Sequence, residues 1–155
     1  MFGKPYGDYV RFQKTWLILI AVVGFARLAL SIYGVPDMTV RFFSMNVVGV
    51  VALFYYGLRV GPSGFGSYRH LLPLVFNQNF LTNAIVVLGI ALSAMGKPNI
   101  FDAPEYRPPF GQPSPMNHAL AHLLLANIAG TLVQWGFTSL VMLIGGRPRR
   151  TLEAA

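Results

Sequence analysis

The sequence predicts an all-α integral membrane protein, a single domain folded as a four-helix transmembrane bundle with both termini in the cytoplasm. The chain has 155 residues, of which 54% are hydrophobic and only 11% are charged, whereas soluble domains carry about 25% charged residues. It contains four long apolar stretches, and a chain this short cannot bury four such helices in a water-soluble core. Lysine and arginine gather at one set of helix ends, as they do in membrane proteins.

The first half of the chain predicts a tail and two helices. Residues 1–14 are basic and aromatic, which is typical of a tail in the lipid headgroup layer or in water. The first helix is expected over 15–33, because Gly34 and Pro36 follow as stop signals. A tight turn on the outer side then leads to the second helix, expected over 39–60.

The third helix is expected over 71–95, after a short glycine-rich loop. Pro73 falls in its first turn, where proline is tolerated. Gly96 and Pro98 stop the helix. The segment 97–116 is rich in proline, which favours extended structure. We expect this segment to be an outer loop that serves either as a plain connector or as a docking surface for a partner.

The fourth helix is expected over 117–146, the longest uncharged run in the chain. An α-helix satisfies its own backbone amides, which lipid requires. About 20 apolar residues cross a hydrocarbon core of ~30 Å. This run has 30 residues, or ~45 Å at the helical rise, so the helix must tilt or protrude.

The orientation follows from the distribution of basic residues. Eight lie on the side of the two termini, and three lie on the opposite side, which places both termini in the cytoplasm. The eight are Lys4, Arg11, Lys14, Arg59, Arg69, Arg147, Arg149 and Arg150, and the three are Arg41, Lys97 and Arg107.

A first candidate site lies in the outer half of the predicted bundle. It would combine Arg27, Asn46, His118 and His122, which come from three helices. No acid lies within a predicted helix, so Arg27 has no carboxylate partner there. It would either extend to the headgroups or hold an anionic or carbonyl oxygen of a ligand or another subunit.

The two histidines are four residues apart and therefore share one helix face. One imidazole could ligate the metal of a haem or chlorin or hydrogen-bond a quinone carbonyl. Alternatively, His118 and His122 cap the helix start and meet interfacial water, or contact a partner subunit. The chain has no cysteine, and no third metal ligand lies nearby in sequence, so we predict no metal site.

A second polar set is predicted to hold two helices together. The fourth helix carries a stripe on the face opposite its histidines, and the third helix carries amides at the inner half. Such groups pack against each other in membranes, and a hydrated pathway is the alternative. The stripe is Asn127, Thr131, Gln134 and Thr138, and the facing amides are Asn77, Gln78, Asn79 and Asn83.

The sequence contains no catalytic motif and no intramembrane carboxylate pair, so we expect no catalytic activity. It also lacks a basic stripe for nucleic acid. The leading hypothesis is an accessory or scaffolding subunit of a larger membrane complex, one engaged in electron transfer or energy conversion. Its partners would be the bilayer and other membrane subunits or copies of itself. The alternatives are an electron-transfer subunit that binds haem, chlorin or quinone through His118 or His122, and a small transporter.

Overall fold

A computed structural model describes residues 1–97, 101 and 114–145 of the chain. This part is all-helical, and it contains four segments long and apolar enough to cross a membrane. They are Tyr6–Ile32, Met38–Arg59, Tyr68–Ala94 and Pro115–Gly145. The length and composition of these helices confirm the predicted class, a helical multi-pass membrane protein.

Helix α1 (Tyr6–Ile32) begins well before the predicted start at residue 15. The expectation of a tail over 1–14 is therefore wrong from Tyr6 onward. The early turns are helical because they pack inside the bundle: Tyr9 and Gln13 are fully buried. The Tyr9 ring meets the Phe65 ring edge-on at 5.4 Å, and its hydroxyl donates to the backbone oxygen of Met1 at 2.8 Å.

The second predicted helix is split in two. A short helix α2 (Asp37–Val40) is separated from α3 (Met45–Arg59) by residues 41–44. Ser44 has an extended backbone, and its hydroxyl accepts a hydrogen bond from the Val47 amide at 3.4 Å. Serine in this position starts a new helix, so the prediction of one continuous helix over 39–60 is wrong at this point.

Helix α4 (Tyr68–Ala94) matches the third predicted helix closely, and Pro73 lies in its early turns. The fourth helix is continuous but not uniform. It consists of α5 (Pro115–Leu120), a π-helical segment η3 (Ala121–Ala126) and α6 (Asn127–Gly145). The predicted last residue of this helix, Gly146, lies outside the described part. So does most of the proline-rich segment, residues 98–100 and 102–113.

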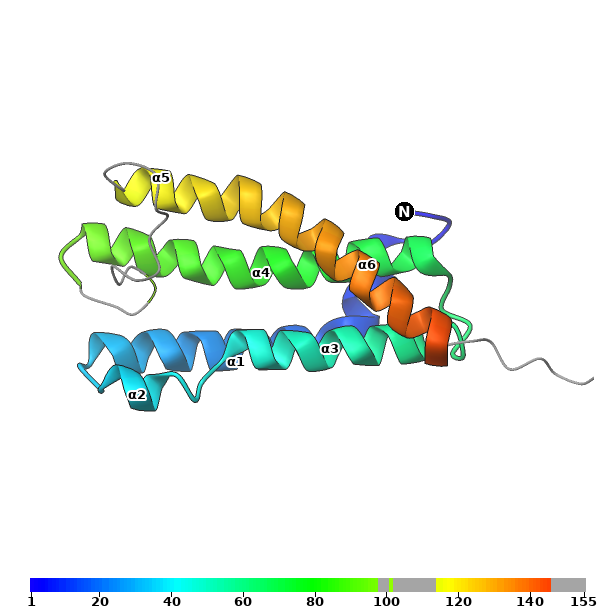
Figure 1. Cartoon of the computed structure of the whole chain (residues 1–155), viewed down its shortest axis with the longest axis horizontal. Helices are drawn as coiled ribbons and strands as arrows, with labels where there is room; N and C mark the ends of the chain where they lie inside the picture. The colour runs from blue at the N-terminus through cyan, green and yellow to red at the C-terminus, as the bar shows by residue number, and fades with distance from the viewer. Residues whose placement is uncertain (98–100, 102–113, 146–155) are drawn as a thin grey trace, which may run out of the picture.

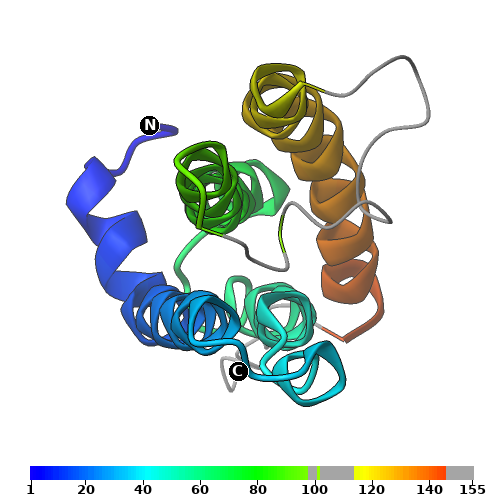
Figure 2. The same cartoon turned by 90° about the vertical axis from the view of Figure 1, so that its left-hand side faces the viewer.

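The helices form two layers at one end of the bundle (Figure 1). Helices α1 and α3 lie in one layer, and α4 and α5 lie in the other, as the end-on view also shows (Figure 2). Helix α6 starts beside α4 and crosses to the far end of α3. There, Gly57 of α3 lies against Val141 and Thr138 of α6. Helices α3 and α6 therefore meet at one end and diverge toward the other.

The interior changes character along α4. Its first turns contribute to an apolar cluster that includes Leu71, Leu74 and Val75. A second apolar cluster contains Ile85 from further along α4, with Ile20 of α1. Between these clusters, α4 carries the buried side chains of Gln78, Asn79 and Asn83. A polar layer therefore lies between two apolar clusters.

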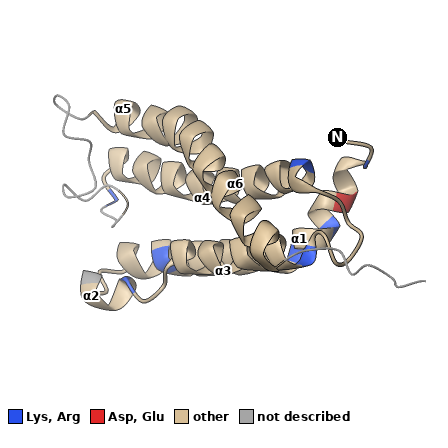
Figure 3. Ribbon diagram, turned by 45° about the vertical axis from the view of Figure 1, so that its right-hand side comes forward, with Lys and Arg blue, Asp and Glu red and all other residues tan. Residues whose placement is uncertain are grey.

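The charges of the described residues are also distributed unequally (Figure 3). The end where α1 begins and α6 stops carries five basic residues, and the opposite end carries two, with Arg27 within α1. The five are Lys4, Arg11, Lys14, Arg59 and Arg69, and the two are Arg41 and Lys97. The assignment of the first end to the cytoplasm stays a prediction from the sequence.

Candidate functional site: a polar cavity within the bundle

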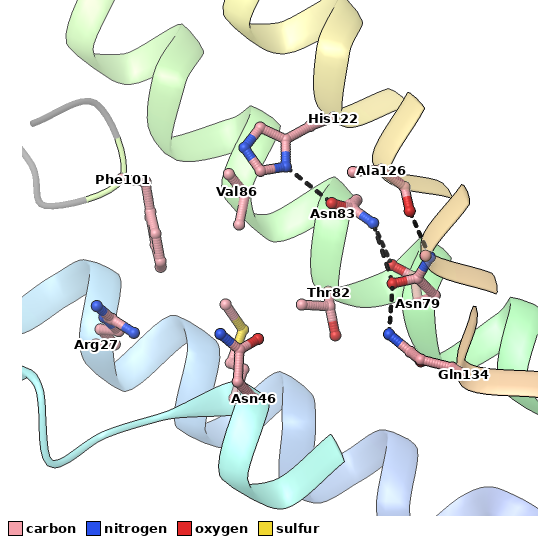
Figure 4. Close-up of a pocket in the computed structure, with 12 residues that line it drawn as sticks. Arg27, Asn46, Asn79, Thr82, Asn83, Val86, Phe101, His122, Ala126 and Gln134 are labelled. Carbon is pink, nitrogen blue, oxygen red and sulfur yellow. Dashed lines mark hydrogen bonds between the residues drawn. The ribbon is translucent and has the colours of Figure 1, made fainter. Parts of the chain in front are cut away.

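A cavity of about 370 Å³ opens where α3 and the fourth helix diverge (Figure 4). Residues from α1, α3, α4, η3 and α6 line it, together with Phe101. They are Arg27, Met45, Asn46, Asn79, Thr82, Asn83, Val86, Phe101, His122, Ala126, Gly130 and Gln134. The wall combines one cation, one imidazole, several amides and a hydroxyl with apolar side chains.

Asn79 is the centre of the hydrogen-bond network beside this cavity. Its amide nitrogen lies 2.9 Å from the backbone oxygen of Ala126, 3.2 Å from that of Asn127 and 3.3 Å from the Thr131 hydroxyl. Its amide oxygen accepts from the Gln134 side chain at 3.4 Å. This one side chain therefore joins α4 to η3 and α6 at several points.

Asn83, one helical turn further along α4, binds the histidine. The His122 Nδ1 atom lies 2.9 Å from the Asn83 amide oxygen. The Asn83 amide nitrogen lies 3.0 Å from the backbone oxygen of Asn79 and 3.2 Å from the Asn127 side-chain oxygen. His122 and Asn127 therefore reach the same residue of α4.

This convergence contradicts the expectation that the histidines and the stripe beginning at Asn127 lie on opposite faces. In an α-helix, residues five apart differ by about 140° in direction. The segment η3 between them is π-helical, and its i→i+5 hydrogen bonds bring residues five apart close to one face. The π-helical segment therefore turns His122 and Asn127 toward the same neighbour.

Arg27 lies across the cavity from His122 (Figure 4). Its guanidinium carbon is 5.2 Å from the centre of the Phe101 ring, a cation–π distance. Its Nε atom is buried and has no hydrogen-bond partner among the described residues. Asn46, from the first turn of α3, lines the same space. Three of the four residues predicted for the outer site therefore face one cavity.

His118, the fourth predicted residue, takes a different place. It is buried in α5, and its ring centre lies 5.1 Å from that of His122. It does not line the cavity. The structure therefore places His122 in the cavity wall and His118 next to His122, outside the cavity.

The remaining residues predicted to join helices are spread more widely. Gln78 donates to the backbone oxygen of Gly49 in α3 at 3.2 Å, and Asn77 accepts from the Tyr6 hydroxyl of α1 at 3.2 Å. Thr138 donates to the Gln134 backbone within its own helix at 2.7 Å. Only part of the predicted polar set therefore connects α4 with the fourth helix.

Sequence reasoning missed six lining residues: Met45, Thr82, Val86, Phe101, Ala126 and Gly130. The sequence held a signal for Thr82, because it lies one helical turn from the predicted site residue Gln78 and therefore on the same helix face. In the structure its hydroxyl donates to the Gln78 backbone oxygen at 3.1 Å. Met45 and Phe101 are apolar and carry no local signal for a site. A second cavity of about 240 Å³ adjoins the first and shares Met45, Asn46, Asn79, Thr82 and Gln134 with it.

Comparisons of the chain with protein-family models, with curated proteins and with solved structures found no match. Function must therefore be inferred from the chemistry of the cavity itself. In the part of the chain that the structure describes, no three His, Asp or Glu side chains are grouped as metal ligands. What the cavity offers is hydrogen bonding, one positive charge and an apolar wall.

Proposed function

We propose that this chain is a membrane subunit that binds a small ring-shaped ligand with oxygen substituents, of the quinone type, in the cavity beside Arg27 and His122. The observation that supports this most is Arg27. Its buried Nε lacks a hydrogen-bond partner among the described residues. A buried donor without an acceptor costs free energy, so a ligand oxygen would complete the site.

The size and walls of the cavity agree with this proposal. Small-molecule sites measure about 300–1,000 Å³ and combine apolar walls with a few polar groups, and this cavity measures about 370 Å³. Val86, Met45 and Phe101 provide apolar surface for a flat ring. Ligation of a haem or chlorin by His118 has less support, because His118 lies outside the lining.

Replacing Arg27 with glutamine is expected to weaken the binding of duroquinone by roughly 10- to 100-fold, because a hydrogen bond to a charged group contributes about 1.5–3 kcal/mol. The measurement is calorimetric titration of the protein in lipid nanodiscs. Arg59→Gln is the matched control, because Arg59 is exposed in the last turn of α3 and does not line the cavity. An unchanged affinity in Arg27→Gln, or no saturable binding to the native chain, would refute the proposal.

The hypothesis of a non-catalytic accessory subunit in a larger membrane complex stays a prediction, as does the transporter alternative. After extraction in a mild detergent, we expect the chain to migrate on a native gel with a mass well above that of a 17.0 kDa monomer. Mass spectrometry of that band would identify the partner subunits or show only further copies of this chain. Migration as an isolated small species in several mild detergents would contradict the hypothesis.

A further inference from the structure

The hydrogen bonds around Asn83 determine how its amide group is oriented. One end of this amide lies 3.0 Å from the backbone oxygen of Asn79. A backbone oxygen can only accept hydrogen bonds, so the amide nitrogen must occupy that end. The amide oxygen is then the atom that lies 2.9 Å from Nδ1 of His122.

This orientation also determines where His122 carries its proton. An amide oxygen can only accept, so the Nδ1 atom must be the donor and must carry the hydrogen. A neutral imidazole has one N–H group, and its other nitrogen is an acceptor. The Nε2 atom therefore presents a lone pair, and it points toward the side of the cavity where Phe101 lies (Figure 4).

The two sides of the cavity thus offer opposite hydrogen-bonding groups. Nε2 of His122 accepts, whereas Arg27, on the other side, can only donate. A quinone carries two carbonyl oxygens, both acceptors, and one of them would face the lone pair of Nε2. A hydroquinone carries hydroxyl groups, so one of them can donate to His122 while the oxygen of the other accepts from Arg27.

We propose that the site selects the reduced, hydroxyl-bearing form of its ring ligand, because Asn83 holds His122 as a hydrogen-bond acceptor. This inference rests on the proposed function and specifies the ligand for the same cavity. The cation–π contact between Arg27 and Phe101, 5.2 Å long, keeps the donor on the far wall. Binding alone is involved, and the ligand is neither oxidised nor reduced.

The first test measures the affinity of both forms at pH 8, where an ordinary imidazole is neutral. Duroquinol, kept reduced without oxygen, is expected to bind the protein in nanodiscs about tenfold or more tightly than duroquinone, since the quinone leaves an acceptor facing an acceptor. His122→Gln should bind both forms with similar affinity, because a glutamine amide can either donate or accept. Asn77→Leu, a control on the same helix outside the cavity, should keep the preference.

The second test observes the proton directly by ¹⁵N NMR of protein labelled at histidine, with His122→Gln to assign the signals. At pH 8 we expect Nδ1 of His122 to carry the hydrogen and Nε2 to be bare. Asn83→Leu should remove this bias, and a thermal melting curve would establish that the variant is folded. If that variant does not fold, the native spectrum alone decides.

The outcomes separate this inference from the proposed function. A hydrogen on Nε2, or a quinone that binds as tightly as the quinol, would overturn the inference while leaving a quinone-type site in place. Failure of both forms to bind would overturn the proposed function and the inference with it. The proposed function and the inference would both be supported by two results together. Nε2 would carry no hydrogen, and the native chain would prefer the quinol while His122→Gln would not.

Discussion

Replacing Asn79 with leucine is expected to lower the free energy of unfolding by about 2–3 kcal/mol. A single side-chain hydrogen bond between membrane helices contributes only about 0.6 kcal/mol on average. Asn79, however, contacts two backbone oxygens, Thr131 and Gln134. Leucine would leave the half-buried side-chain amide of Gln134 without its partner, which adds a desolvation cost of about 1–3 kcal/mol.

Reversible unfolding in mixed micelles with increasing dodecyl sulfate, followed by circular dichroism, would measure this loss. Asn77→Leu is the matched control, because Asn77 precedes Asn79 by two residues and makes one exposed hydrogen bond, to Tyr6. We expect the control to change stability by less than about 0.5 kcal/mol. Equal effects of the two substitutions would show that the Asn79 network does not hold α4 against the fourth helix.

Replacing Gly57 with leucine is expected to destabilise the protein by about 3 kcal/mol and to push α6 away from α3. A Cβ atom at this position would already lie 2.7 Å from Val141 Cγ1 and 2.9 Å from the backbone oxygen of Thr138. The backbone oxygen cannot rotate away, so the helices themselves must move, and such overpacking costs about 1–3 kcal/mol or more.

The control for this substitution is Gly136→Leu in α6. A Cβ atom there would have no neighbour within 4 Å, and leucine favours a helix more than glycine does. The same unfolding assay should therefore find Gly136→Leu as stable as the native chain, or more so. A Gly57→Leu variant that matched it would show that α3 and α6 do not depend on close contact at Gly57.

The sequence was sufficient for the helical class because apolar length and stop signals act locally. Helix α4 ends at Ala94, within a residue of its predicted end and just before Gly96. It begins at Tyr68, three residues before the predicted start, so Pro73 lies inside it. The start of α1 was not predictable in this way. Tyr9 and Gln13 look like residues of an interfacial tail, and only packing against other helices makes them an ordered, buried turn.

The candidate site was predicted in part for the same reason. Helix direction and rise predicted one depth for Arg27, Asn46 and His122, and the structure places all three beside one cavity. The amides of α4 were expected further inside, as a separate set. The π-helical segment joins the two sets by turning His122 toward Asn83, and a change from i→i+4 to i→i+5 bonding depends on neighbouring helices rather than on a local motif.

The break before α3 has a consequence for the surrounding lipid. Helix α3 has 15 residues and is therefore ~22 Å long, shorter than the ~30 Å of an average hydrocarbon core. The break carries Arg41, an exposed cation. A charge among acyl chains is costly, so residues 41–44 are expected to lie at the edge of the membrane. The bilayer beside α3 is expected to be thinned, and phospholipids with short acyl chains should fit this side of the protein best.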